Sequence, residues 1–504
     1  MTRPSIKTLG ELKSSGYTPL SVKDELRKNL LKAITNGSSP FEGVVGFEDT
    51  VIPQIYNAIL AKHNFILLGL RGQAKSKLIR QLPNLLDKYS PRIAGSALNE
   101  SPFSPITARY KKLVCQQGDD VEIEWMSREE RFQEKLATPD VTIADLIGDI
   151  DPIKAAREKL DISDEEVIHW GILPRTNNGI FTINELPDLQ PRIQVGLLNI
   201  MEEGDIQVRG FPIRVALDIL LVFTANPEDY TNRGNIITPL KDRIDSQIIT
   251  HYPKSIKDSV AITKQEAWSE RGSGIKIPDF MAEIIENISS EARASEYVDQ
   301  TSGVSARVSI AAMECLISAV ERRATVNREK ETVPRISDLY ATLPALTGKM
   351  ELVYEGELEG PTLVATSLIG KAIKIQFERY FPAPSKKKRQ IIQIPDGAGL
   401  PESIDDESNP FEAVTDYFGS GLKLDLNDKA PLSDYHLALD KIAGLKDIVS
   451  RHFQPADSDE YYLRMEFVLE GLHQFNVLAK DISDANFSYT DMLANMLRDV
   501  EVDT

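Results

Sequence analysis

Cysteine is nearly absent from this chain of 504 residues, which contains only Cys115 and Cys315. Two cysteines so far apart in the sequence cannot build a disulfide framework or a cysteine-rich zinc site. Basic residues are also in deficit, because 58 Lys and Arg face 76 Asp and Glu, giving a formal net charge of -18. This balance argues against a broad nucleic-acid-binding face, although it does not exclude a local basic patch.

Long apolar runs are missing as well. The longest, VALDILLVFTA at 215–225, is shorter than the roughly 20 residues that cross a bilayer, and it contains Asp218. The opening segment MTRPSIKTLGELKSSG has no apolar core of the secretory-signal type. We therefore expect a cytoplasmic protein in a reducing compartment, with no membrane-spanning segment.

What the chain does contain is a change of pattern along its length, with hydrophobic residues making up 41%. Residues 1–40 mix charge with helical spacing and predict an N-terminal helical segment. Residues 41–253 alternate polar helical stretches with short β-rich runs, namely FILLGL, GIFTI, ILLVFTA and SQIITHY. This alternation predicts an α/β domain in which helices sandwich a parallel sheet.

The second half has a different character. Residues 254–375 show apolar positions at three- and four-residue spacing, as in FMAEIIENISSEA, and predict an all-helical lid domain. Residues 376–410 are rich in Pro, Gly and charge, which is typical of a linker. Residues 411–504 again have helical spacing, so we expect an extra helical C-terminal region.

A phosphate-binding loop follows the first β-rich run, where FILLGL leads into RGQAKSKLIRQL. The pattern is GxxxxAKS, one residue away from the P-loop pattern GxxxxGK[ST]. In a P-loop, backbone N–H groups surround the phosphates, Lys meets the outer phosphates and Ser or Thr binds Mg²⁺. The sequence thus predicts an ATP and Mg²⁺ site at Gly69, Gly72, Gln73, Ala74, Lys75 and Ser76.

Ala74 occupies the place of the last P-loop glycine. Alanine is tolerated where the backbone is right-handed helical, so we expect helical backbone here and only a small effect on phosphate binding.

A second β-rich run, GIFTINEL, ends in Asn184 and Glu185, where most nucleotide-hydrolysing sheets have Asp-Glu. At the carboxyl end of a buried parallel strand, Glu185 would orient or deprotonate the attacking water. Asn184 would accept a hydrogen bond from the water shell of Mg²⁺ without supplying a charge. We therefore predict a Mg²⁺-dependent ATPase site with its general base intact and a weakened metal-side ligand.

A third run, ILLVFTANPED, ends in Asn226, a neutral polar residue suited to positioning water between base and phosphate. Two arginines follow in order. Arg243 lies in PLKDR before another β-rich run, and Arg307 lies in SGVSARVSI at the start of a predicted helix.

Together these motifs resemble AAA+ ATPases of the branch that contains MoxR proteins and the ATPase subunit of magnesium chelatase. The resemblance covers about 41–375 and rests on FEGVVGFEDTV, GLRGQAKS, GILPRTNNGIFTINEL, FTANPED, PLKDR and GVSARVS. It also includes TPDVTIADLIGDIDPIKAAREKL, which looks like the helix-2 insertion of this branch and is a candidate contact for substrate.

The resemblance implies a homo-oligomeric ring, usually a hexamer, with ATP between subunits. Arg243 would then reach the neighbouring subunit's γ-phosphate, Arg307 would sense nucleotide state from the lid, and Val45, Gly46 and Phe47 would lie near the adenine. It also implies a separate partner with a von Willebrand factor A domain, since this chain has no D-x-S-x-S motif.

Three functions fit these features. The first is a MoxR-like, chaperone-like ATPase that remodels a partner protein or loads it with metal. The second is the ATPase motor subunit of a magnesium chelatase, which the core motifs fit equally well. The third is a scaffold that binds ATP but turns it over very slowly, and Asn184 is its main support.

Overall fold

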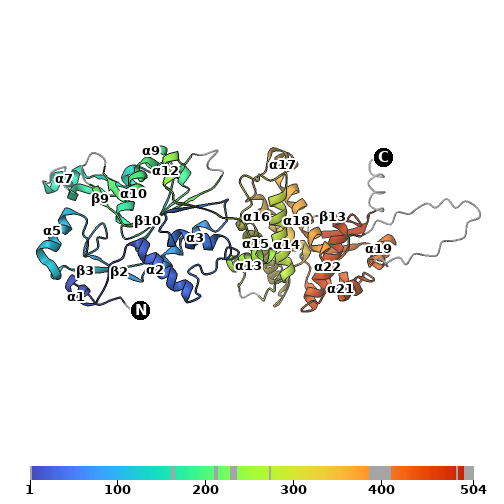
Figure 1. The fold of residues 1–504 in the computed structure, drawn as a ribbon. Coiled ribbons are helices and arrows are strands. Elements are labelled where there is room, and N and C mark those ends of the chain that lie inside the picture. Colours follow the sequence, from blue (N-terminus) through green and yellow to red (C-terminus); the bar gives the residue numbers. More distant parts are fainter. Residues whose placement is uncertain are drawn as a thin grey trace, which may run out of the picture. The chain divides into compact units, whose positions relative to one another are not determined.

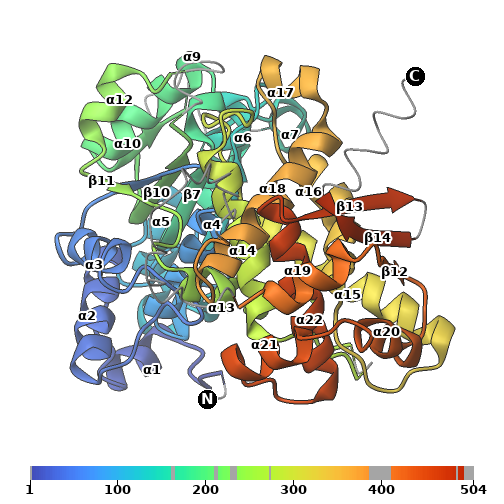
Figure 2. The same cartoon turned by 90° about the vertical axis from the view of Figure 1, so that its right-hand side faces the viewer.

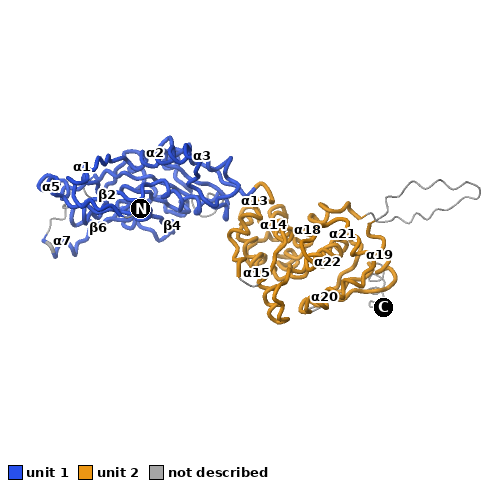
Figure 3. Tube along the Cα trace, turned by 90° about the horizontal axis from the view of Figure 1, so that it is seen from below, with its two compact units in different colours: residues 1–253 blue, residues 254–504 orange. Residues whose placement is uncertain are grey.

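The computed structural model describes residues 3–159, 165–208, 214–227, 235–271, 274–384, 410–483 and 486–492. The chain divides into two compact units, residues 1–253 and 254–504 (Figure 3). Most of the predicted linker, from 385 to 409, lies outside the described residues. Each unit has hydrophobic clusters of its own and is described by itself.

The first unit is built on a five-stranded parallel sheet, as the alternating pattern predicted (Figure 1). Every neighbouring pair of strands runs parallel, so all carboxyl ends lie along one edge. Across the sheet the strands are, in order, β11 (Ser246–Ile249), β1 (Phe65–Leu68), β10 (Ile219–Ala225), β7 (Gly179–Asn184) and β4 (Phe132–Leu136).

Both faces of this sheet are buried, which is why its central strands are continuous apolar runs. Successive side chains point to opposite faces. In β1, for example, Ile66 and Leu68 belong to one hydrophobic cluster, whereas Phe65 and Leu67 belong to another. Helices cover the two clusters, and their bounds are α2 (Val22–Thr35), α3 (Val51–Leu60), α4 (Lys75–Ile79), α6 (Ile143–Leu146), α8 (Ile172–Arg175), α9 (Pro191–Gln194), α10 (Leu198–Glu202) and α12 (Thr238–Arg243). Helix α1 (Leu9–Ser14) instead buries Leu9 and Leu12 in two smaller clusters.

The predicted N-terminal helical segment is packed against the sheet domain. Helix α2 is capped by Ser21, whose hydroxyl accepts the Asp24 N–H, and its Leu26 and Leu30 belong to the cluster that contains Phe65 and Leu67 of β1. Its Glu25 carboxylate forms a buried bidentate ion pair with the Arg131 guanidinium, with nitrogen–oxygen distances of 2.8 and 2.6 Å.

Three separate two-stranded antiparallel sheets accompany the parallel sheet in the first unit. The sequence pattern did not predict them. One carries α5 (Ala108–Gln117), and another encloses α7 (Pro152–Glu158) within the stretch that resembles a helix-2 insertion. The strand pairs are β2 (Tyr89–Ile93) with β3 (Ile123–Ser127), β5 (Gly148–Ile150) with β6 (Ile168–Trp170), and β8 (Asp205–Gln207) with β9 (Arg214–Ala216).

The second unit begins with helices, as predicted. Amphipathic α14 and α15 bury one face each, which includes Ile284 and Leu316. Its helices are α13 (Ile256–Glu266), α14 (Asp279–Ala294), α15 (Ala306–Asn327), α16 (Leu343–Thr347), α17 (Tyr354–Glu359), α18 (Pro361–Glu378), α19 (Glu412–Gly419), α20 (Leu432–Leu439), α21 (Leu445–His452) and α22 (Ser458–Gln474). Within the described residues, none of the chain's helices is both long and apolar enough to cross a membrane.

The C-terminal region contains a sheet in addition to the predicted helices. Three antiparallel strands lie in the order β12 (Leu424–Asn427), β14 (Asn486–Asp491) and β13 (Leu478–Ser483) (Figure 2). Its residues share one hydrophobic cluster with the helices of 254–384. Phe377 of α18, for example, lies 5.7 Å from the Phe411 ring and 6.0 Å from the Phe467 ring.

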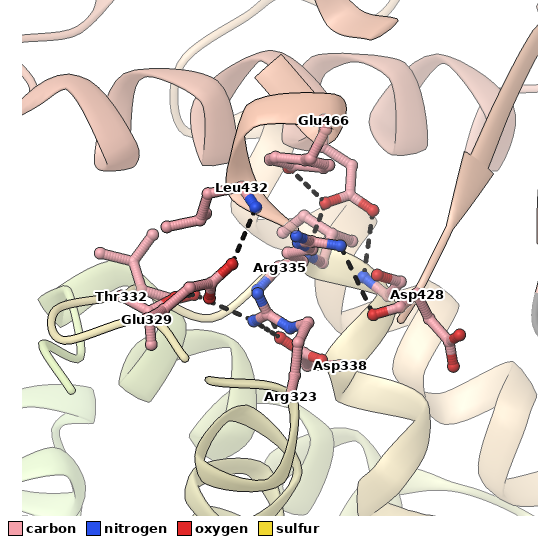
Figure 4. Close-up of polar contacts among 12 residues, drawn as sticks. Arg323, Glu329, Thr332, Arg335, Asp338, Asp428, Leu432 and Glu466 are labelled. Atoms are coloured by element: carbon pink, nitrogen blue, oxygen red, sulfur yellow. Dashed lines mark hydrogen bonds and ion pairs between the residues drawn. The ribbon is translucent and has the colours of Figure 1, made fainter. Parts of the chain in front are cut away.

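A buried polar network also joins the two parts of this unit (Figure 4). The guanidinium of Arg335 donates to the backbone oxygens of Asn427 and Ala430, and Glu466 on α22 accepts the N–H groups of Ile336 and Ser337. Burial raises the pKa of Glu466. Because this network and the apolar cluster both contain residues from 254–384 and from 410–492, the two parts fold together as the second unit.

Candidate functional site

The GxxxxAKS segment forms the loop between β1 and α4, at the carboxyl edge of the parallel sheet. Lys75 is the first residue of α4 and is buried, with 8% of its surface exposed. Its Nζ donates to the backbone oxygens of Gly69 and Leu70, the latter at 3.1 Å. The lysine side chain therefore bridges back to the start of its own loop.

Gly69 is required because the loop passes close to the end of β11. A Cβ atom at this position would overlap the Thr250 hydroxyl and the Gln73 side-chain oxygen. Those two groups are themselves hydrogen-bonded at 2.7 Å, and the Thr250 hydroxyl also donates to Leu68 O. Gln73 thus has a structural role in holding the loop, and Thr250 is a site residue that the motif pattern did not predict.

The expected backbone conformation at Ala74 is wrong. Ala74 has φ 53° and ψ 15°, which is left-handed, and it caps α4 instead of lying within the helix. A left-handed conformation costs an L-residue roughly 1–2 kcal/mol. Alanine is therefore accommodated here with strain, at the position where the P-loop pattern has glycine.

A chain of side chains connects the P-loop to Glu185. Lys75 Nζ donates to Asn226 Oδ1 at 2.6 Å, and Asn226 Nδ2 donates to Glu185 Oε2 at 2.8 Å. Asn226 follows β10, which lies between the P-loop strand β1 and the Asn184 strand β7. The strands that precede Lys75 and Glu185, β1 and β7, are therefore not neighbours, and Asn226 connects the two side chains from the strand between them.

The backbone turns sharply where β7 ends. Glu185 has φ 55° and ψ 49°, a left-handed conformation that is uncommon for a residue with a side chain. Its N–H donates to the Thr224 hydroxyl at 3.1 Å, and that hydroxyl donates to Asn184 Oδ1, also at 3.1 Å. Thr224 therefore fixes both residues of the Asn-Glu pair.

Glu134 is a further acidic residue beside the end of β7, and the sequence patterns did not identify it as a site residue. It lies on β4, opposite Thr182 of β7, and its Oε1 accepts the side-chain N–H of Asn184. It also accepts from Arg80, whose Nε lies 2.9 Å from Oε2. The hydrogen bond to Glu134 raises the pKa of Arg80. No sequence signal was available, because FQEKL is a half-exposed edge strand without a clear apolar alternation.

The segment with Val45, Gly46 and Phe47 packs beside the end of β11. Phe47 is buried and meets the ring of His251 edge-on at 5.1 Å. Tyr252, one residue further on, contacts the P-loop, because its hydroxyl donates to Arg71 O at 3.0 Å. The segment predicted to be near the adenine is thus linked to the P-loop through residues 250–252.

Arg243 lies away from the P-loop of its own chain. It is the last residue of α12 and precedes β11, so it lies beyond the amino ends of the strands, whereas the P-loop is at their carboxyl ends. Its guanidinium binds Glu202 Oε2, with the Nε contact at 2.9 Å. Arg307 is exposed in the first turn of α15, in the second unit.

The oxygen groups present suit Mg²⁺ bound together with a nucleotide. Within the described residues, no group of three or more His, Cys, Asp or Glu side chains could hold an ion alone. Mg²⁺ commonly takes only one or two protein ligands and completes its shell with water and phosphate oxygens. Ser76 is exposed at the start of α4, and Asn184 Oδ1 and the Glu134 carboxylate belong to the same corner of the sheet.

Comparison with known proteins adds three structural likenesses. No family model matches the chain, and no curated protein matches it. A candidate ATPase from Cytophaga hutchinsonii is 15% identical, with 71% of this chain and 97% of that chain covered and a TM-score of 0.29. The RuvB Holliday junction branch migration motor of Thermotoga maritima is 14% identical, with 72% and 77% covered and a TM-score of 0.31.

The third likeness is to the complex between the BchI and BchD subunits of magnesium chelatase. It is 16% identical, covers 63% of this chain and 98% of the matched chain, and has a TM-score of 0.33. At such low identity and similarity the assignment of the fold rests on this chain's own sheet and loop.

Proposed function

We propose that this protein is a Mg²⁺-dependent ATPase. The observation that carries the proposal is the hydrogen-bonded series Lys75, Asn226 and Glu185 at the carboxyl edge of a parallel sheet, directly behind a P-loop. Lys75 offers a cation for the phosphates, Asn226 a neutral amide that can position water, and Glu185 a carboxylate that can accept a proton. These groups serve the transfer of a phosphoryl group to water.

In this proposal the triphosphate replaces the present partners of Lys75. Lys75 Nζ then contacts the outer phosphates in place of the Gly69 and Leu70 oxygens. The backbone N–H groups of the loop face the phosphate oxygens. Glu185 accepts a proton from the attacking water, and Asn226 orients that water. Mg²⁺, held by Ser76 and the phosphates, would neutralise developing negative charge.

We further propose that the chain works as a ring and remodels a partner protein, in the manner of MoxR-like AAA+ proteins. The position of Arg243 supports this, because a residue at the amino edge of the sheet is suited to a site on a neighbouring copy and not to its own P-loop. Release from Glu202 would free its guanidinium for a γ-phosphate. A partner with a von Willebrand factor A domain belongs to the same proposal.

The test measures ATP-analogue binding and phosphate release by the full chain with Mg²⁺. We expect Lys75→Ala to lose most binding, and Glu185→Gln to retain binding but release phosphate at least about a hundredfold more slowly, as a lost general base implies. Lys77→Ala, a neighbouring lysine two residues on, is the matched control and should change neither. Equal phosphate release by the original chain and Glu185→Gln would remove the hydrolysis proposal.

A scaffold that binds ATP with little turnover is the second candidate, and the uncharged Asn184 beside Glu185 favours it. It predicts analogue binding that depends on Lys75 together with phosphate release that does not depend on Glu185. The magnesium-chelatase motor is tested separately, by porphyrin chelation in the presence of companion subunits.

A further inference from the structure

The side chains of Asn184 and Glu134 form a complementary pair that explains why position 184 is an amide. Asn184 Nδ2 donates to Glu134 Oε1, while Asn184 Oδ1 accepts from Thr224. An aspartate at 184 would place a second carboxylate against Glu134 with no proton between them, which is strongly unfavourable in a partly buried place. Only 9% of Asn184 and 22% of the Glu134 side chain are exposed.

The carboxylate of Glu134 lies on the side of α4 that carries the predicted Mg²⁺ ligand. Ser76 and Arg80 are four residues apart, and the Arg80 N–H donates to Ser76 O at 3.1 Å, so the backbone is helical between them. Residues four apart share one face of a helix, about 6 Å apart along its axis. Because Arg80 binds Glu134, that carboxylate lies on the same side of α4 as Ser76.

We propose that Glu134 supplies the acidic group on the metal side of this site, with Asn184 as the residue that positions it. Where most nucleotide-hydrolysing sheets have a carboxylate at the end of this strand, β7, this chain has one on the neighbouring strand β4. The amide of Asn184 holds that carboxylate by a charge-assisted hydrogen bond. The Arg80 guanidinium pairs with that carboxylate in the structure. This inference rests on the proposed function and adds a residue to its site.

The experiment compares the affinity of a fluorescent ATP analogue with and without Mg²⁺, using the full chain. Glu134→Gln should reduce the Mg²⁺ enhancement of affinity about tenfold, the lower end of the range for residues that support a metal's ligands. Affinity without Mg²⁺ and the melting temperature should stay unchanged. A purely structural role of Glu134 would instead lower both affinities together.

The exchange variant is the decisive arm. Asn184→Asp alone should weaken the Mg²⁺ enhancement, because a carboxylate at 184 cannot donate the hydrogen bond that holds Glu134. Glu134→Gln with Asn184→Asp restores one carboxylate and one amide in reversed order, and should recover most of the enhancement. Glu129→Gln, an exposed glutamate in the turn before β4, is the matched control.

Two results would overturn the inference: an unchanged Mg²⁺ enhancement in Glu134→Gln, or no recovery in the exchange variant. If analogue binding still depends on Lys75 in that case, the proposed ATPase function stands and only the role of Glu134 falls. If the original chain binds no analogue at all, both fall together.

Discussion

At the scale of single residues, the site is framed by two left-handed residues that are not glycine. Ala74 precedes the P-loop lysine, and Glu185 ends the strand that carries the proposed base. Such conformations persist where surrounding contacts determine them, and they concentrate at functional positions. For Glu185 those contacts are the hydrogen bond from its own N–H to Thr224 and the one from Asn226 to its carboxylate.

Ala74→Gly is expected to stabilise the protein. The left-handed backbone costs alanine roughly 1–2 kcal/mol, whereas the extra freedom of an unfolded glycine costs about 0.5–1 kcal/mol, so a gain of about 0.5–1 kcal/mol remains. Urea denaturation of the first unit measures it. Ala33→Gly, the same change inside right-handed α2, should destabilise by about 1 kcal/mol. Equal losses for both variants would contradict the left-handed assignment.

At the scale of elements, α2 is joined to the sheet by charge as well as by packing. Arg131 precedes β4, is 2% exposed, and donates to both oxygens of Glu25 on α2 and to Asn178 O before β7. A buried pair of this kind contributes little net stability, but losing one partner leaves the other charge uncompensated. The ion pair therefore ties the N-terminal segment to the strands β4 and β7.

Arg131→Met is accordingly expected to destabilise the first unit by about 3–5 kcal/mol, because Glu25 stays buried without its cation. Arg131→Met combined with Glu25→Leu should recover much of that loss. Arg128→Met is the control, since its partner Glu129 is mostly exposed, and it should leave stability nearly unchanged. Chemical denaturation gives the free energy of unfolding of the original chain and of the three variants. A large loss in Arg128→Met would mean that the turn before β4 is sensitive to any substitution, and the buried ion pair would not be the cause.

At the scale of the whole molecule, residues 254–384 and 410–492 share one core, and a charged pair lies inside it. Lys480 and Glu470 are 2.7 Å apart, with 2% and 0% of their side chains exposed. Tyr489 and Tyr340 hydroxyls also donate to Glu470. Burial opposes ionisation of Glu470, but the charge of Lys480 outweighs it and lowers the pKa of Glu470 from 4.5 to about 2.

This pair makes the stability of the second unit depend on pH. A depressed pKa stabilises the folded state above pH 4.5, and that contribution is lost as the pH falls from 4.5 toward 2. In Lys480→Met, burial raises the pKa of Glu470 instead, so stability should fall as the pH rises above 4.5. The deficit at neutral pH should reach about 3–5 kcal/mol.

Unfolding free energies of both proteins between pH 3 and 8 measure this slope. Glu466, whose pKa is raised by burial, contributes the opposite slope. Because the charge of Lys480 lowers that pKa, Lys480→Met should make the loss of stability with rising pH steeper. Lys423→Met removes an exposed partner of Asp425, whose lowered pKa is due first to Ser488, and should change the profile little. Parallel profiles for Lys480→Met and the original chain would contradict the role given to the pair.

The sequence by itself determined the local features of this protein. The runs FILLGL, GIFTI, ILLVFTA and SQIITHY correctly predicted four strands of the parallel sheet. The first three form strands that are buried throughout, which explains their apolar character, whereas the fourth forms the partly exposed edge strand β11. The GxxxxAKS spacing likewise predicted the loop between a strand and a helix. These features depend on residues that are neighbours in the chain.

Tertiary structure alone decided which distant groups meet. Glu134 and Asn184 are 50 positions apart, and their contact depends on the pairing of β4 with β7, which the half-exposed FQEKL run does not predict. The same holds for Thr250 against Gln73 and for the C-terminal sheet. Strand order and register emerge from burying both faces of a sheet at once, and no stretch of neighbouring residues carries that information.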